Sequence, residues 1–180
     1  MNNKFSSFII NFSYTIISNL VSLLVSSLVV LIVPKLIGVE EYSYWQLYLF
    51  YSSYVGFLHF GWSDGIYLRF GGKKYEELDK KIFFSQFYML SILQIIIGVI
   101  VFIAASNLVA NADRLFILNM TAICMIIINM RQMLLLIMQG TNLIKYYARV
   151  TMFGRILYFV LICILLILGS RQYQLMIVAD

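Results

Sequence analysis

Charge in this chain is confined to short gaps between five long apolar blocks. The blocks cover residues 8–33, 44–60, 82–105, 115–138 and 150–169. Most of them are close to the ~20 residues that a helix needs to cross ~30 Å of hydrocarbon. Inside a bilayer each block can satisfy its own backbone only as a helix. The pattern therefore predicts a polytopic transmembrane helix bundle of the all-α class.

The composition agrees, because 62% hydrophobic and 12% charged residues leave too little polar surface to cover a water-soluble globule. We expect a single transmembrane helical domain over residues 1–180 that forms an incomplete N-terminal lobe. The expected helices cover residues 8–33, 44–67, 82–105, 115–138 and 150–169, and a sixth helix begins at 175–179.

The basic residues are distributed unequally between the two sets of gaps. One set holds Lys4, Arg69, Lys73, Lys74, Lys80, Lys81, Lys145, Arg149 and Arg155, and the other holds Lys35, Arg114 and Arg171. Because basic loops stay in the cytoplasm, the N-terminus and segments 71–81 and 140–149 are expected to be cytoplasmic. The net charge of +5 suits a membrane surface and gives no sign of nucleic acid binding.

Three residues are of types that can bind metals or carry out redox chemistry. Cys124 and Cys163 lie within separate apolar blocks and are interpreted as small buried hydrophobic residues. The single histidine, His59, has no Cys, Asp or Glu nearby at the usual ligand spacing. The sequence therefore predicts no metal site.

Six hydroxyl and amide side chains recur every three or four residues along the first block, which places them on one stripe of a helix. They are Ser7, Asn11, Thr15, Ser18, Ser22 and Ser26. Such a stripe either packs closely against neighbouring helices or lines a water-filled path. The spacing leaves both interpretations open.

An arginine stands inside the fourth block, about two turns from its cytoplasmic end. Burying Arg131 at such a depth costs roughly 2.5–3.5 kcal/mol on insertion scales, so we expect it to face a cavity or a partner. Gln132 and Gln139 lie on a nearby face and add polar character. The alternative is an arginine that extends toward the inner headgroups.

Segment 61–72 contains a carboxylate whose environment depends on where the second helix ends. Gly61 and Gly65 form a small-xxx-small pair, so the helix could continue to about Tyr67 with Asp64 inside the membrane. Asp64 could then pair with Arg69 or Arg131, or bind a proton or cation. Alternatively, the helix ends near Trp62 and Asp64 caps a loop.

Three stretches carry a resemblance to a known family. They are Leu36-Ile37-Gly38-Val39-Glu40-Glu41-Tyr42, Phe60-Gly61-Trp62-Ser63-Asp64-Gly65-Ile66-Tyr67-Leu68-Arg69 and Gln139-Gly140-Thr141-Asn142-Leu143-Ile144-Lys145-Tyr146-Tyr147-Ala148. The chain resembles the polysaccharide (O-antigen and capsule repeat-unit) flippases of the multidrug/oligosaccharidyl-lipid/polysaccharide transporter superfamily. Ser43 stands where that family usually has a glycine.

The resemblance implies flipping of a polyprenyl-pyrophosphate-linked oligosaccharide across a bacterial plasma membrane, by alternating access between two helical lobes. It implies membrane lipids and a second lobe or chain as partners, possible proton or sodium coupling, and no other cofactor. Length suggests that the chain corresponds to most of the first lobe. The residues offered for a substrate cavity are Asn11, Thr15, Ser18, Ser22, Asp64, Arg69, Arg131 and Gln132.

Two other functions stay open: a multidrug or cation antiporter of the same superfamily, which shares this helix plan, and a non-transporting membrane assembly subunit, which the chain's length allows. An enzyme is not expected, because membrane-face catalysis normally needs clustered carboxylates or a His/Asp constellation. The eight acidic residues here are scattered along the chain.

Overall fold

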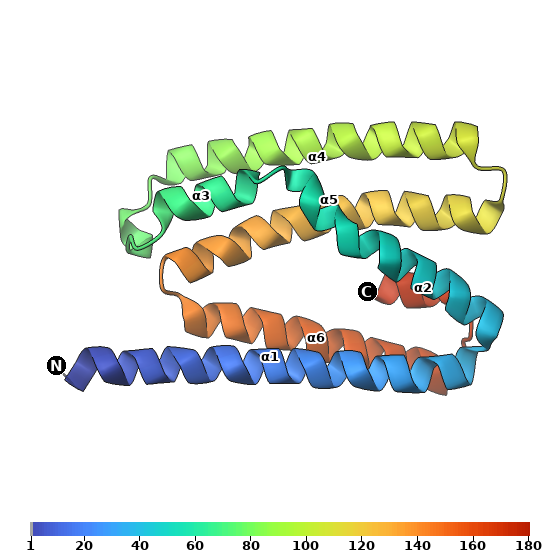
Figure 1. Ribbon diagram of the computed structural model, residues 1–180, viewed down its shortest axis with the longest axis horizontal. Coiled ribbons are helices and arrows are strands. Elements are labelled where there is room, and N and C mark those ends of the chain that lie inside the picture. Colours follow the sequence, from blue (N-terminus) through green and yellow to red (C-terminus); the bar gives the residue numbers. More distant parts are fainter. Residues whose placement is uncertain (1) are drawn as a thin grey trace. The chain divides into compact units, whose positions relative to one another are not determined.

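The computed structural model describes residues 2–180, with side chains from Phe5 onward, and contains no strand within that range (Figure 1). The side chain of Lys4, which contributes to the charge bias, lies outside the described residues. The elements are α1 (Asn2–Ile37), α2 (Val39–Tyr54), η1 (Val55–His59), α3 (Trp62–Phe70), η2 (Tyr75–Glu77), α4 (Lys80–Leu108), α5 (Ala112–Gly140), α6 (Ile144–Ile167) and α7 (Tyr173–Ala179). The all-α class is confirmed.

Four helices are long and apolar enough to cross a membrane: α1 from Phe5 onward, α4, α5 and α6. They correspond to four of the five apolar blocks, so the chain is membrane-embedded by helix length and composition. Helices α4 and α5 begin before their apolar blocks, at capping residues. Asp79 accepts a hydrogen bond from the Ile82 amide at 3.1 Å, and Asn111 accepts one from the Arg114 amide at 2.9 Å.

The second expected helix, 44–67, is not formed as one piece. The structure divides it into α2, the short 3₁₀ helix η1 and α3. The division occurs at Phe60 and Gly61, which both adopt left-handed backbone conformations with φ of 50° and 75°. A right-handed helix cannot pass through such residues. The expected count of five spans and a sixth beginning is therefore not confirmed, and α7 is a short helix.

The chain groups into two compact units, the first formed by residues up to Tyr42 with Leu143–Asp180 and the second by Ser43–Asn142. In the first unit α1 packs along α6, and α6 contacts α7 (Figure 1). The amide of Tyr173, at the start of α7, donates to the Glu41 carboxylate at 2.6 Å. The single transmembrane domain over residues 1–180 that the sequence predicts stays a prediction.

The second unit is built on the helix pair α4 and α5, which run side by side and are joined by the short segment 109–111 (Figure 1). Helix α3 and η1 both pack on α5. The core of this unit contains Ile66, Phe70, Leu78, Phe83, Leu90, Met133 and Ile137. Apolar side chains from α3, α4, α5 and the segment before α4 therefore hold this part of the unit together.

A glycine contact fixes the end of α3 against the end of α5. The Gly72 amide donates to the Gly140 carbonyl at 2.9 Å. A Cβ at Gly140 would lie 3.2 Å from the ring of Tyr67 and 3.6 Å from the Cα of Gly71. The two helix ends approach this closely because position 140 has no side chain.

Replacing Gly140 with valine is expected to destabilise the second unit by about 1–3 kcal/mol, because the added carbons overlap Tyr67 and Gly71. Thermal unfolding of the purified chain in detergent, followed by circular dichroism, measures the change. Gly65→Val is the matched control, since a Cβ there meets nothing within 4 Å. Equal losses in the two variants would contradict a packing role for Gly140.

Candidate functional site

The interruption between α2 and α3 is the most irregular part of the second unit. Phe60 ends η1 in a left-handed conformation, and Gly61 repeats that conformation before α3 begins at Trp62. A non-glycine residue in this conformation costs about 1–2 kcal/mol. Such strain persists only where surrounding contacts hold it.

Breaking a helix leaves backbone carbonyls without their usual amide partners, which is costly where no water is available. Two buried side-chain amides donate to carbonyls of η1. Gln94 Nε2 of α4 donates to the Leu58 carbonyl at 2.9 Å. Asn129 Nδ2 of α5 donates to the Val55 carbonyl at 3.1 Å. The 3₁₀ helix is thus held from two neighbouring helices.

The two amides also bind each other, since Asn129 Nδ2 donates to Gln94 Oε1 at 2.8 Å. Both side chains are completely buried. This Gln94–Asn129 pair connects α4, α5 and η1 in one network. Asn129 Oδ1 has no hydrogen-bond partner among the described residues, so the network keeps one buried acceptor unfilled.

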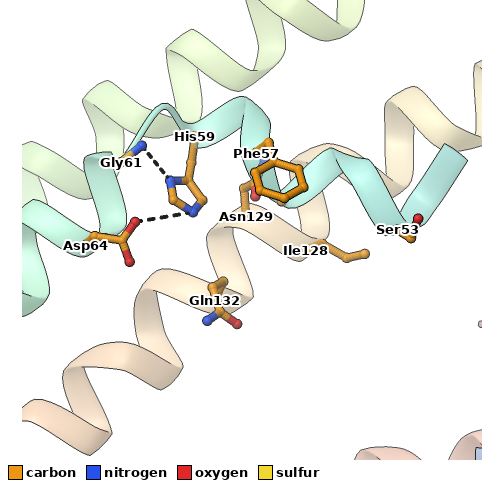
Figure 2. Close-up of a pocket in the computed structure, with 9 residues that line it drawn as sticks. Ser53, Phe57, His59, Gly61, Asp64, Ile128, Asn129 and Gln132 are labelled. Carbon is orange, nitrogen blue, oxygen red and sulfur yellow. Dashed lines mark hydrogen bonds and ion pairs between the residues drawn. The ribbon is translucent and has the colours of Figure 1, made fainter.

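A hollow of about 410 Å³ opens beside this network within the second unit (Figure 2). Its walls come from the end of α2, the break, the start of α3 and the middle of α5. The lining residues are Ser53, Gly56, Phe57, His59, Gly61, Asp64, Ile128, Asn129 and Gln132. One carboxylate, one imidazole, a hydroxyl and two amides therefore share the wall with an exposed aromatic ring, and no lysine or arginine lines it.

His59 joins the two sides of the break (Figure 2). Its Nδ1 accepts a hydrogen bond from the Gly61 amide at 3.0 Å. Its Nε2 lies 3.9 Å from a carboxylate oxygen of Asp64. The histidine side chain is 14% exposed and the aspartate side chain 64% exposed, so the carboxylate stands at the open side of the hollow.

The four predicted site residues of the second unit fall into two groups. Asp64 and Gln132 line the hollow, and Asp64 lies in the first turn of α3. Neither sequence interpretation of Asp64 is observed, because a new helix starts before it with Gly61 as the N-cap. Arg69 and Arg131 are exposed and do not line the hollow.

The expected pairing of Asp64 with an arginine is not formed among residues 2–180. The carboxylate faces His59 instead, across five positions of sequence. The guanidinium of Arg69 lies in the last turn of α3, 5.9 Å from the ring centre of Phe70. A cation over an aromatic face gains a modest electrostatic attraction.

The other four predicted residues belong to α1 in the first unit. Their hydroxyls bond within the helix: Thr15 donates to the Asn11 carbonyl at 3.1 Å, Ser18 to the Thr15 carbonyl and Ser22 to the Ser18 carbonyl, both at 2.9 Å. Ser18 is fully buried, while Asn11, Thr15 and Ser22 are partly buried. At Ser18 the stripe therefore serves packing rather than a water-filled path.

Sequence analysis missed Gln94, Asn129 and His59 as members of this site. The first two carry a usable signal, since each is an amide in the middle of a long apolar block and polar residues at that depth are seldom without a role. His59 was judged only for metal spacing. Among the described residues no group of three or more His, Cys, Asp or Glu side chains could hold a metal ion.

Comparisons of the chain with protein-family models, with curated protein sequences and with solved structures found no match. The family resemblance therefore depends on the three sequence stretches alone.

Replacing Gln94 with leucine is expected to lower the stability of the second unit by about 1–3 kcal/mol, because it leaves the Leu58 carbonyl without its side-chain donor. Asn129→Leu should have a similar effect through the Val55 carbonyl. The double variant should lose less than the sum of the two, by about 0.5–3 kcal/mol, because the residues contact each other.

Thermal unfolding in detergent micelles tests this cycle, with Asn107→Leu as control. Asn107 lies on α4, is exposed, and donates only within its own helix, to the Ile103 carbonyl at 2.9 Å. Its replacement should change stability by no more than about 0.5 kcal/mol. Strict additivity of the Gln94 and Asn129 variants would show that the pair does not act as one network.

Proposed function

We propose that this chain forms part of a transporter that flips polyprenyl-pyrophosphate-linked oligosaccharide across the bacterial plasma membrane. The observation that carries the proposal is an interrupted helix, braced by buried amides, beside a polar hollow in an apolar chain. Transporters of several folds place substrate and ion sites at discontinuous helices of this kind.

The family resemblance supports the same proposal. Of the three stretches that carry it, residues 60–69 supply Gly61 and Asp64 to the hollow. The start of stretch 139–148 packs on the same helix, because Gly140 meets the ring of Tyr67. Two motifs far apart in sequence therefore contact each other in the second unit.

The proposed roles follow the charges. A pyrophosphate requires basic partners, and the exposed guanidiniums of Arg69 and Arg131 offer them. The hollow, with Asp64 and Gln132, suits hydroxyl groups or a coupling cation instead. Alternating access uses two lobes, the second of which another copy of this chain would supply in the test below, and the exposed apolar faces of the helices contact membrane lipids.

A second candidate, a cation or multidrug antiporter, is favoured by one observation. The hollow contains a carboxylate and the exposed ring of Phe57 but no lysine or arginine. An organic cation would be attracted by the carboxylate and could stack on the aromatic face.

Proteoliposomes test the proposal with a polyprenyl pyrophosphate bearing a fluorescently labelled N-acetylglucosamine. Protection of the label from a membrane-impermeant reductant measures flipping, which the chain should accelerate. Arg131→Gln and Asp64→Asn should each slow it about tenfold, the equivalent of losing one charge-assisted contact of ~1.4 kcal/mol. Arg114→Gln, a basic residue outside the proposed machinery, is the matched control.

Ethidium transport in the same liposomes separates the two candidates. Ethidium movement that depends on Asp64, without lipid flipping, would favour the cation antiporter. No movement of either probe would contradict transport by this chain.

The proposed orientation makes a second prediction, that positions 73 and 114 lie on opposite sides of the membrane. Single cysteines replace Lys73 and Arg114, both exposed, after Cys124 and Cys163 are changed to alanine. An impermeant maleimide applied to intact cells should label position 114 only, while position 73 should need permeabilised cells. Equal labelling of both in intact cells would contradict this topology.

A further inference from the structure

The chain has a single histidine, and the hydrogen bond to its ring fits one tautomer of the imidazole. His59 Nδ1 accepts from the Gly61 amide, so this nitrogen has a free lone pair and carries no proton. A neutral imidazole with an acceptor Nδ1 must have its proton on Nε2. That proton lies on the side of the ring nearest Asp64, whose oxygen is 3.9 Å from Nε2.

A second proton would change these two contacts in opposite directions. Protonated Nδ1 is a donor and can no longer accept from Gly61, so the amide loses its partner. The positive ring would meanwhile be attracted more strongly to the Asp64 carboxylate. Phe60 and Gly61 form the linker between η1 and α3. Protonation therefore replaces the Gly61 hydrogen bond, which holds this linker, with an ion pair to Asp64 of α3.

No other charged group lines the hollow to oppose this exchange. Helix α5 contributes Ile128, Asn129 and Gln132, α4 reaches η1 through the uncharged Gln94, and the end of α2 contributes Ser53. The nearest further charges in sequence are Arg131, beside Gln132 but outside the lining, and Arg69 at the far end of α3. Asp64 is thus the one acid that faces the ring among the described residues.

The two sides of the linker are anchored separately. The Gln94–Asn129 pair holds η1 through the Val55 and Leu58 carbonyls. Helix α3 is held at its other end, where Gly72 bonds to Gly140. Among the side-chain contacts of the described residues, His59 is the one that bridges Phe60 and Gly61, the two left-handed residues.

We propose that His59 is a proton-binding site that controls the linker between η1 and α3. Deprotonated, it fixes the left-handed turn through the Gly61 amide; protonated, it releases that amide and pairs with Asp64. Histidine is suited to this task because it changes charge between about pH 5 and 8. The proposal goes beyond the transport function and holds whatever substrate the chain moves.

Nuclear magnetic resonance of the full chain in lipid nanodiscs tests the site directly. Because there is one histidine, ¹⁵N-histidine labelling gives one pair of ring-nitrogen signals, and ¹⁵N-glycine labelling reports the Gly61 amide. Near pH 8 the ring signals should show the Nε2–H tautomer. As pH falls, the ring nitrogens and the Gly61 amide should change together with one midpoint.

Two variants sharpen the result. Asp64→Asn removes the carboxylate that the protonated ring would pair with, so it should abolish that pairing and leave the Gly61 hydrogen bond intact near pH 8. His59→Asn keeps an acceptor that can bond the amide two residues on but cannot titrate. In that variant the Gly61 amide should stay constant over the same pH range.

A distance measurement reports the consequence for the helices. Spin labels at Phe50 of α2 and Leu68 of α3, both exposed, should give a narrow distance distribution near pH 8 that broadens or shifts near pH 5. The Cys124→Ala, Cys163→Ala background removes competing thiols, and His59→Asn should abolish the change. An Nδ1–H tautomer, separate midpoints for His59 and Gly61, or a distance independent of His59 would each overturn the proposal.

Discussion

The second unit depends on a pair of buried amides that replace the hydrogen bonds of a broken helix. Gln94 and Asn129 donate to the carbonyls of Leu58 and Val55 and to each other. A buried carbonyl without a donor is costly, and these two amides supply donors to η1 from α4 and α5. The amide pair therefore holds η1 beside the left-handed turn and the hollow, while apolar contacts and the Gly72–Gly140 bond hold α3 on α5.

The elements on both sides of the helix break are held by fixed contacts, while the linker between them has a contact that can change. The amide pair holds the start of the break, and the approach of Gly72 to Gly140 holds the end of α3. Between them lies a linker of two left-handed residues whose side-chain contact is a titratable imidazole. A change of a single proton is then concentrated at the linker, because the elements on both sides are independently fixed.

Hydropathy predicted much of this fold, because four apolar blocks can satisfy their backbone hydrogen bonds in a membrane by forming helices. It could not predict the break in 44–67, since that break is stabilised by donors 36 and 74 positions away in sequence. Gly61 can be read from the sequence, but together with Gly65 it fits a small-xxx-small pair in a continuous helix as well as it fits a break. The His59–Asp64 contact was missed because a spacing of five puts two side chains on different faces of a continuous helix. Only the turn at Phe60 brings them together.

The distribution of charge in this unit assigns different chemistry to different places. The hollow has the carboxylate of Asp64 and neutral polar groups, while the guanidiniums of Arg69 and Arg131 are exposed elsewhere. A pyrophosphate would be repelled by the former and attracted by the latter. If the chain moves an anionic lipid carrier, its phosphate groups and the proton at His59 therefore occupy separate sites. Two helices connect these sites, because α3 carries both Asp64 and Arg69 and α5 carries both Gln132 and Arg131.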